Sequence, residues 1–574
     1  MKRVIKTLFL VVVCGCFTAV QLTPGQTSRA GRSNRASASQ QPPAPNVCAI
    51  IPCQVPLPTA PHTPAEARPF FDWFSWESFI AINWPALISN NVVQRGQADL
   101  TRSVGDLSVP RVWESWKAEW ELFRPASTSN PNAPGTPSAW SSFDLDPNLL
   151  PCSNANVNFL QSGGKLLVMS TKMDSVLNQV DEAMAGPLIA QNCTYARYEI
   201  RVDESEYNFI KSPPAPNQPL YIYANLPQPG SPNYPVNFAS SSTSSPFPLS
   251  SCQPSQNPCS YGAIEIKAAW REMKPGEDTS RYYTVNALIV DDSNTATPCR
   301  KATMGLVGLH IAHKVSPFRE WVWSTFEQVD NVPPDSGFTP NPGTPPPACS
   351  GAPSPFSFNN GYTTPVTTDG WNWPGSPGNQ PPTPTVPIST NPSPPVQVSR
   401  NTPIVYQNQA SPTTQDINKQ FQQALSGTVW QNYQLVVTQW PRSSGNFQPF
   451  PGGISSYPQS CDLPIPTDVT FSGIPSGEPI MAVANTTMET YFQSTDLGIA
   501  SCMHCHYLSS GQDFSFMLAR EAFKPPSMAA LFRAGKGPKN DPVTRLRQFL
   551  QQGRTKHQKK FQKTLSQTKR AKTK

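Results

Sequence analysis

The sequence predicts an α+β protein in which a β-rich antiparallel region with tryptophan-rich helices precedes a C-terminal helical segment. Short runs of β-branched and aromatic residues, bounded by turn formers, recur through the middle of the chain. Several runs alternate in polarity, as Ile264 and Ile266 do against Glu265 and Lys267, which is typical of half-solvated antiparallel strands. No glycine-rich phosphate loop follows any of these runs, so a nucleotide-binding parallel sheet is not supported.

The expected strands define the extent of the globular region. We expect strands at 165–171, 195–202, 219–226, 262–270, 281–290, 305–314 and 432–440. They place a β-rich domain at residues 69–332 that continues at 403–484. The 67 prolines of the 574-residue chain are dense at 333–402, where they can supply neither ladder donors nor continuous helix. We therefore expect this stretch to be an insertion or a linker.

Two aromatic stretches at the start of the domain have helical spacing. They are PFFDWFSWESFIAINWPA at 69–86 and VPRVWESWKAEWELFRP at 109–125. In the second stretch Trp113, Trp116 and Trp120 fall at positions i, i+3 and i+7. Such a stripe packs into a core more often than it lines a cofactor site, so we expect two amphipathic helices that contribute to the core.

The beginning of the chain predicts export. Residues 1–20 have a basic start and then an apolar run that is too short to span a bilayer as a permanent helix, which is typical of a signal peptide. The VCGC stretch ending at Cys16 resembles a lipoprotein cleavage box, so a lipid anchor is the alternative to free release. Residues 21–68 are rich in Pro, Ser, Ala and Gln and are expected to be a disordered lead-in. We expect a periplasmic protein.

Cysteine usage agrees with export. Most cysteines stand beside Pro, Ser or Asn in expected loops, and in an oxidising compartment such cysteines usually form disulfides. The local bridges expected from spacing are Cys48 with Cys53 and Cys252 with Cys259. The remaining connectivity cannot be derived from sequence.

The C-terminal region is expected to be helical over residues 485–552. Thr486 with Glu489 three residues later forms a capping-box pattern that would begin a helix. Further cap and proline signals predict short helices after residue 513. The chain then ends in a basic tail at 553–574.

Within this region, SCMHCHYLSSGQDF at 501–514 carries the pattern C-x-x-C-H at Cys502, Cys505 and His506. In this pattern the two thiols form thioethers with haem and the adjacent imidazole binds the iron. A structural zinc site would need a second ligand pair, and no such pair recurs. A thiol redox pair would not require the histidine. The pattern therefore predicts one covalent haem c with iron bound by His506.

On these residues the sequence resembles c-type cytochromes, and in particular large exported bacterial mono-haem proteins with one C-terminal motif. The stretch NTTMETYFQSTDLGIASCMHCH is the most specific part. WESFIAINWPA, VWESWK, IEIKAAWRE and GLVGLHIAHK through WVWSTFEQVDN are also similar, so the resemblance spans roughly residues 70–525 with gaps. It implies a cytochrome-c-like helical haem segment and electron transfer, and it implies no substrate.

The second axial ligand of the iron is open. Met517 and Met528 are within sequence reach, although both fall on apolar helical faces where core packing is the usual role. His310 lies on an expected strand with His313 on its opposite face. His504 is too close to the attachment loop to reach the distal side, and we expect it to be exposed. His310, Met517, Met528 or no residue at all remains the set of alternatives.

The distal side would decide the class of function. A strong sixth ligand favours one-electron transfer, whereas an open iron would favour a peroxidase- or oxidase-like haem enzyme. A binding or structural module with an accessory haem is a third class. Glu327 and Asp330 are candidate acid or base groups, yet they fit surface or capping roles equally well. The sequence contains no Ser/His/Asp nucleophile pattern.

Charge narrows the expected partners. The formal net charge is +7, and much of it lies in the basic tail. A solvated tail is the ordinary interpretation, and docking to acidic periplasmic redox proteins or to an anionic membrane surface is the alternative. Nucleic-acid binding is not supported, because the chain is expected to be exported and contains no basic motif of a nucleic-acid-binding fold.

Overall fold

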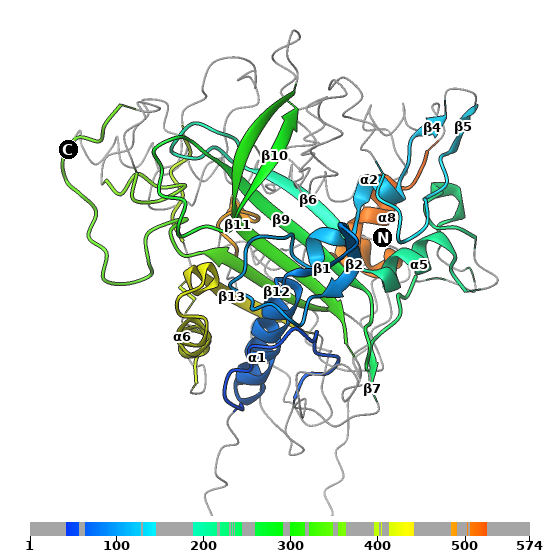
Figure 1. Cartoon of the computed structure of the whole chain (residues 1–574), viewed down its shortest axis with the longest axis horizontal. Coiled ribbons are helices and arrows are strands. Elements are labelled where there is room, and N and C mark those ends of the chain that lie inside the picture. Colours follow the sequence, from blue (N-terminus) through cyan, green and yellow to red (C-terminus); the bar gives the residue numbers. More distant parts are fainter. Residues whose placement is uncertain are drawn as a thin grey trace, which may run out of the picture. The chain divides into compact units, whose positions relative to one another are not determined.

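A seven-stranded antiparallel sheet organises the chain (Figure 1). Neighbouring strands follow the order β13-β12-β11-β9-β6-β3, and β10 pairs with β11 off this path. The strands are β3 (Lys117–Ala118), β6 (Arg197–Val202), β9 (Ile264–Met273), β10 (Thr284–Val290), β11 (Cys299–Lys314), β12 (Trp321–Gln328) and β13 (Tyr433–Gln439). Every pairing in this sheet is antiparallel, which confirms the predicted β-rich antiparallel region.

The structure is a computed structural model, and it describes part of the chain. The described residues are 42–56, 64–127, 130–144, 188–214, 218–228, 231, 234, 236–243, 259–290, 299–315, 321–347, 354–362, 395–400, 403–404, 412–440, 484–490, 502 and 506–524. The expected signal at 1–20, the expected strand at 165–171 and the basic tail at 553–574 lie outside these residues.

Short helices and hairpins surround the sheet. Three two-stranded hairpins pair β1 (Ala86–Ser89) with β2 (Val92–Ala98), β4 (Ala126–Ser127) with β5 (Asn130–Pro134), and β7 (Ser242–Thr243) with β8 (Cys259–Ser260). The helices are α1 (Pro64–Ile82), η1 (Trp113–Ser115), α2 (Glu119–Leu122), α5 (Glu204–Lys211), η4 (Tyr223–Asn225), α6 (Thr414–Ala424), η6 (Val429–Asn432), η10 (Tyr507–Gln512) and α8 (Phe516–Glu521). None of the described helices has both the length and the apolar character needed to cross a bilayer.

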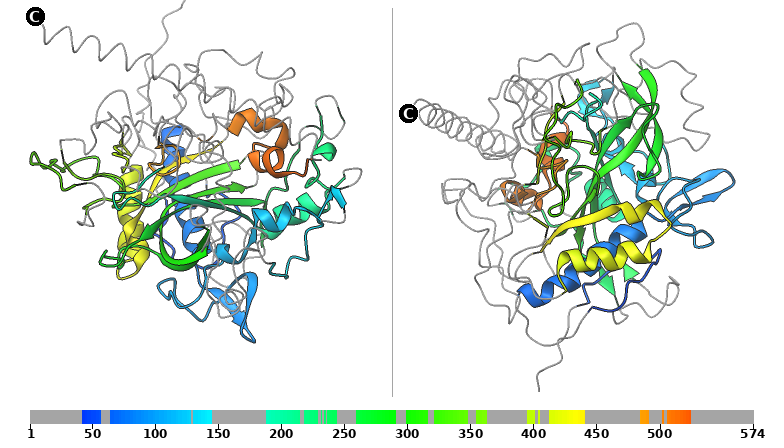
Figure 2. Two further views of the ribbon diagram at one scale, coloured as in Figure 1. Left: turned by 90° about the horizontal axis from the view of Figure 1, so that it is seen from above. Right: turned by 90° about the vertical axis from the view of Figure 1, so that its left-hand side faces the viewer.

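The helix expected at 69–86 is present as α1. It packs beside α6, as Figure 2 shows, and both helices contact β13. Trp76 is fully buried, stacks on Phe421 of α6 and donates its indole N–H to Asn418 Oδ1 over 2.8 Å. Buried Asp72 accepts hydrogen bonds from Thr414 and Thr438, which ties α1 to α6 and β13 through polar contacts as well.

The single helix expected at 109–125 is wrong. This stretch forms η1, the short strand β3 and the one-turn helix α2. No continuous helix forms because Lys117 and Ala118 pair with β6 at the edge of the sheet. These strand hydrogen bonds outweigh the local preference for helix that the spacing of the tryptophans indicates. Trp113 and Trp116 are nevertheless buried in the main hydrophobic cluster, which confirms the expected core role of these two tryptophans.

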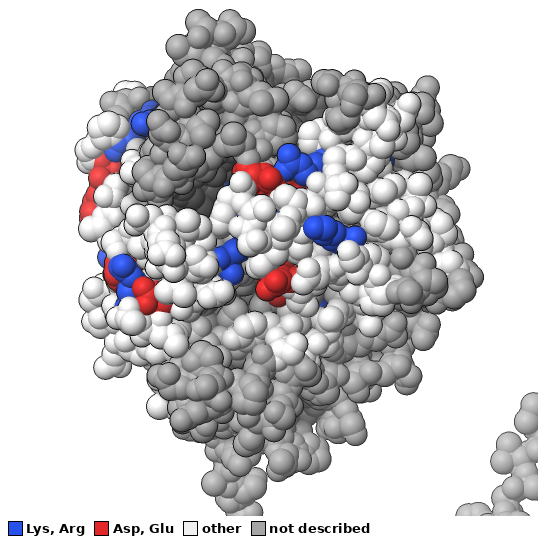
Figure 3. All heavy atoms as spheres, turned by 45° about the vertical axis from the view of Figure 1, so that its right-hand side comes forward, with Lys and Arg blue, Asp and Glu red and all other residues white. Residues whose placement is uncertain are grey.

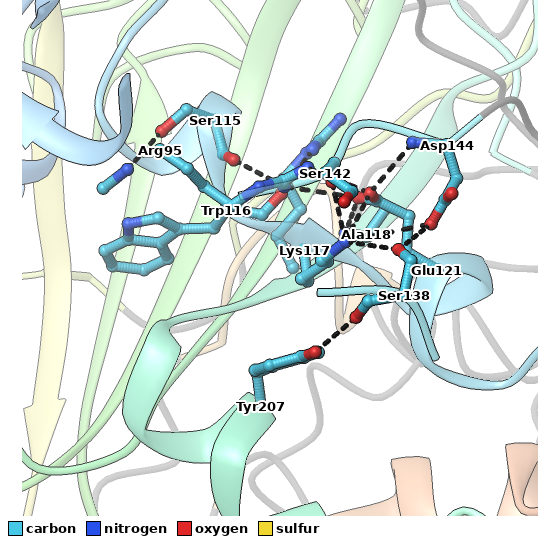
Figure 4. A network of polar contacts seen from close by, with 12 residues as sticks. Arg95, Ser115, Trp116, Lys117, Ala118, Glu121, Ser138, Ser142, Asp144 and Tyr207 are labelled. Carbon is cyan, nitrogen blue, oxygen red and sulfur yellow. Dashed lines mark hydrogen bonds and ion pairs between the residues drawn. The ribbon is translucent and has the colours of Figure 1, made fainter. Parts of the chain in front are cut away.

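A buried network of ion pairs and hydrogen bonds stabilises the 109–125 stretch as η1, β3 and α2 (Figure 4). Glu121 accepts hydrogen bonds from Arg95 over 3.0 Å, from Lys117 over 3.2 Å and from the Ala118 N–H over 2.9 Å. Lys117 also donates to Ser138 Oγ over 3.1 Å. Arg95, Lys117 and Glu121 are all buried, and burial lowers the pKa of Lys117. Because each charge has an internal partner, we interpret this network as structural.

Five of the expected strands are confirmed, as β6, β9, β10, β11 and β13. The strand expected at 219–226 is wrong, because after Pro219 the chain makes a turn and η4, with one bridge from Ile222 to Phe523. β12 was not expected. All eight of its residues are buried, so its sequence lacks the alternation that marks a half-solvated strand.

Cys48, Cys53 and Cys193 are disulfide-bonded, and Cys48 and Cys53 are buried. The pairing of Cys48 with Cys53 stays a prediction. So does the pairing of Cys252 with Cys259, since Cys252 lies outside the described residues.

Candidate functional site

The two faces of the sheet differ in chemistry. One face carries Ile264, Ile266, Leu309, Ile311 and Phe326, which join the hydrophobic cluster that α1 and α6 complete. The register places the intervening residues on the opposite face, namely Glu265 and Lys267 of β9, His310 and Lys314 of β11, and Trp323, Thr325 and Glu327 of β12. We call this second face the polar face.

Two C-terminal segments, 484–490 and 506–516, bind the polar face. In the first, Asn485 donates through its side-chain amide to Thr325 Oγ1 over 2.9 Å and to the Phe326 carbonyl over 2.8 Å. Thr486 donates its hydroxyl to Glu327 over 2.8 Å. Gly308 of β11 allows this approach, because a Cβ there would collide with the Thr487 hydroxyl.

The capping box expected with Thr486 is corrected by one residue. Asn485 is in the cap position, since its Oδ1 accepts from the Thr487 N–H over 2.9 Å and its own N–H donates to Glu489 over 2.9 Å. Asn485 precedes Thr486 in the chain and offers the same capping oxygen, so the pattern alone did not distinguish them. The described residues of this segment, 484–490, contain a turn at 486–488.

The two carboxylates considered as acid or base groups have structural partners. Glu327 is fully buried, accepts from the Thr486 N–H and hydroxyl, and is ion-paired with Arg400. Asp330 is ion-paired with Arg281. Glu327 therefore fixes the 484–490 segment to β12, and Asp330 belongs to a surface pair.

The second segment is fixed by Asp513. This residue has a left-handed backbone with φ of 54°, and its carboxylate accepts from Lys314 Nζ over 3.0 and 2.8 Å. The Asp513 carbonyl accepts from the Trp321 indole N–H over 2.6 Å. Both members of the ion pair are buried, so it anchors the turn after η10 to the end of β11.

His506 lies at the start of this anchored segment. Its Nδ1 is 2.6 Å from the Phe514 carbonyl oxygen. A carbonyl can only accept, so Nδ1 carries the proton and the Nε2 lone pair is available to a metal. The imidazole also packs on the Trp323 indole, with ring centroids 4.2 Å apart, and against Phe516, with centroids 5.3 Å apart.

The electrostatics of the site favour a neutral imidazole. Burial, with smaller contributions from His310 and Lys267, lowers the pKa of His506 to about 4, while the hydrogen bond to the Phe514 carbonyl and the nearby Glu489 oppose the shift. An iron ligand must be deprotonated at the coordinating nitrogen. The surroundings of His506 therefore favour the protonation state that iron binding requires.

Of the two motif cysteines, the structure describes Cys502. Cys502 is half-buried and packs against the cluster that contains Trp323, Phe514 and Met517. Cys505 and His504 lie outside the described residues. Cys502 and His506 thus share one layer between the polar face and α8.

The candidates for the second axial ligand fall in different places. His310 is on the polar face, and its Nε2 lies 3.3 Å from Glu489 Oε1. Ala312, two residues along β11, pairs with Trp323, so His310 is a diagonal neighbour of the indole on which His506 rests. Met517 is buried in the same hydrophobic cluster as Trp323 and Phe514, and Met528 lies outside the described residues. His313 is on the opposite face against Phe74, as expected.

Sequence reasoning missed three groups of this site. Lys267 of β9 and Trp323 of β12 approach His506 from the two strands that flank β11, and the Phe514 carbonyl accepts a hydrogen bond from its Nδ1. The alternation of β9 placed Lys267 on the face of Glu265, but it carried no signal that this face lies against His506. Any residue can offer a backbone carbonyl, so the sequence does not indicate which one accepts from His506.

Among the described residues, His506 offers the imidazole nitrogen that a haem iron would need. A porphyrin supplies four nitrogen ligands to its iron, so the protein contributes an imidazole and at most one further group. Within the described residues, no group of three or more His, Cys, Asp and Glu side chains could hold a metal ion by itself. No protein-family model, curated protein or solved structure matches this chain.

Proposed function

We propose that this protein is an exported c-type cytochrome that transfers single electrons in the periplasm. One haem would be attached through Cys502 and Cys505, with His506 as a ligand of the iron. The observation that carries this proposal is the hydrogen bond from His506 Nδ1 to the Phe514 carbonyl. It orients the imidazole of a C-x-x-C-H motif with Nε2 available, which is the arrangement that a proximal haem ligand needs.

The chain's own residues would keep this ligand rigid. Trp323 and Phe516 contact the imidazole ring, and Asp513 with Lys314 fixes the turn that presents the Phe514 carbonyl. When bound, a haem would supply a one-electron redox centre. A fixed ligand favours electron transfer because little rearrangement then accompanies the change of oxidation state.

A haem enzyme with an open distal side is the second candidate. The observation in its favour is the pair of His310 and Glu489, which lies 3.3 Å apart on the face where His506 lies. Such a pair could move a proton to or from a small ligand, or His310 could coordinate the iron itself. Carbon monoxide distinguishes the two, because it binds reduced iron only where a coordination position is open or weakly held.

The partners are proposed to be periplasmic redox proteins. The described face in Figure 3 shows its Lys and Arg side chains in small groups mixed with Asp and Glu. The concentrated positive charge is in the tail at 553–574. Contact with an acidic partner, or with a membrane surface through this tail or a lipid anchor, would be weakened by salt, whereas an apolar contact would not.

The proposal is tested by haem attachment. The protein is expressed with a cytochrome c maturation system and exported, and covalent haem is detected by intact mass and by haem staining after denaturation. We expect one haem per chain in the wild type and none in the double variant Cys502→Ala/Cys505→Ala. A matched double variant of Cys48 and Cys53 should retain the haem. Covalent haem in the Cys502→Ala/Cys505→Ala protein would reject the assignment.

A further inference from the structure

A buried carboxyl group lies behind the anchored 506–516 segment. Glu206 of α5 has no exposed surface, and neither of its carboxyl oxygens has a hydrogen-bond partner among the described residues. Its backbone N–H donates to Asp203, the cap of α5, over 3.0 Å. An ionised carboxylate in this position would be uncompensated and strongly destabilising, so the group must hold a proton or share one.

Four charged groups act on Glu206, one at the start of its own helix and three on other parts of the fold. Asp203 is at the start of α5, Glu265 is on β9, Lys314 is on β11 and Asp513 follows η10. Burial raises the pKa of Glu206 well above its ordinary value, Glu265, Asp203 and Asp513 raise it further, and Lys314 lowers it.

Three of these four groups have partners of their own. Lys314 is paired with Asp513, with its Nζ 2.8 Å from Oδ2. Asp203 Oδ1 accepts from the N–H groups of Glu206 and Ile264, each over 3.0 Å. Glu206 and Glu265 therefore remain as two acidic groups in one buried region, with Lys267 favouring the ionised form of Glu265, and two such groups titrate as a coupled pair.

Glu265 links this pair to solvent and to the haem ligand. It is half-buried, so protons can reach it from outside. Its Oε2 accepts from the Ser515 hydroxyl over 2.8 Å. Burial raises the pKa of Glu265, while the Ser515 bond and Lys267 oppose the shift. Ser515 follows Phe514, whose carbonyl accepts the hydrogen bond from His506 Nδ1. Two adjacent residues, Phe514 and Ser515, therefore connect the proposed iron ligand to Glu265.

We propose that Glu206 and Glu265 form a proton-binding pair, so that the protein takes up one proton from solvent with each electron it accepts. This inference rests on the proposed function. The electron comes from a one-electron donor protein and adds one negative charge near His506, and the proton binds a carboxylate oxygen of the pair. The reverse step releases both. Uptake of a proton balances the added charge in a region of low dielectric.

The test is a redox titration of the holoprotein with dithionite and ferricyanide between about pH 5 and about pH 9, a range that covers raised carboxyl titrations. In the wild type we expect a midpoint potential that falls as pH rises, with a limiting slope of about 59 mV per pH unit for one proton per electron. Glu206→Gln and Glu265→Gln should each flatten this dependence. Glu204→Gln, at an exposed position of the same helix, is the control and should leave the slope unchanged.

A second measurement avoids dependence on the folding of a variant. The reduced-minus-oxidised infrared spectrum of the wild type should contain a band of a protonated carboxyl group. A pH-independent potential in a protein with covalent haem, a slope that survives in both glutamine variants, or a spectrum without the band would each overturn the coupling while leaving the cytochrome intact. Failure to attach haem would instead reject the proposed function, and this inference with it.

Discussion

The apolar and polar faces of the same sheet are built for different tasks. On the apolar face, aromatic side chains of α1 and α6 interdigitate with Phe326 and Leu435, as in an ordinary core. On the polar face, the C-terminal segments are held by discrete polar anchors such as Lys314 with Asp513 and Glu327 with Thr486. Apolar contacts are non-directional, whereas hydrogen bonds and ion pairs fix position. The comparison indicates that the apolar face stabilises the fold and that the polar face fixes the position of the C-terminal segments.

The largest effect is expected on the apolar face. Trp76→Ala removes a fully buried indole that stacks on Phe421 and takes away one of the two donors to Asn418 Oδ1. Truncation of a buried tryptophan costs about 3–5 kcal/mol. We expect a loss of that size in the free energy of unfolding, measured by urea denaturation. A loss below about 1 kcal/mol would show that α1 is not the main stabiliser of the sheet.

Breaking the anchor on the polar face should act more locally. Lys314→Met leaves the buried Asp513 carboxylate unpaired, and removal of one partner of a buried pair costs about 3–5 kcal/mol. We expect protease cleavage near residue 513 before global unfolding. The double variant Lys314→Met/Asp513→Asn should be less destabilised than Lys314→Met. Equal protection of the segment in wild type and Lys314→Met would contradict the anchoring role.

A smaller steric change should separate the 484–490 segment from β11. Gly308→Ala places a methyl group against the Thr487 hydroxyl, and overpacking of this kind costs about 1–3 kcal/mol. The double variant Gly308→Ala/Thr487→Ala should recover part of this loss, because it removes the colliding oxygen. Unfolding free energies of the three proteins give the coupling. Purely additive losses would argue against a direct contact.

The smallest effect concerns pH and the histidine of the apolar face. Burial lowers the pKa of His313 to about 3, from an ordinary 6.5. Between these values the unfolded chain binds a proton that the folded chain does not, so stability is lost as pH falls. The loss from this residue amounts to about 1 kcal/mol for the first unit below its ordinary value. His313→Phe, which keeps a ring against Phe74, should show a shallower decline in unfolding free energy below about pH 6.5.

The same sequence rules predicted the two faces unequally. Alternation placed His310 and His313 on opposite faces of β11 and identified β9, because each strand has one polar side. It failed for β12, where residues on both faces are buried. Helical spacing identified α1, yet it could not reveal that β3 would pair with β6 and break the second helix.

For the candidate site, the motif identified Cys502 and His506 as residue types but not their setting. The Phe514 carbonyl and the Asp513 anchor depend on a left-handed turn and on a lysine that is 199 residues away in the chain. Pairings of that separation follow from the fold and leave no local pattern. Glu489 illustrates the same limit, because the pattern showed a capping carboxylate and the structure adds its contact with His310.

The central claim is that His506, held on the polar face by the Phe514 carbonyl, is a ligand of haem iron. The most direct measurement is the visible spectrum of the oxidised and reduced holoprotein with His506→Gly, recorded before and after adding free imidazole. The account predicts that the variant keeps covalent haem, loses the wild-type spectrum and regains it when imidazole fills the vacated position. A His506→Gly protein whose spectrum equals that of the wild type without imidazole would contradict the claim.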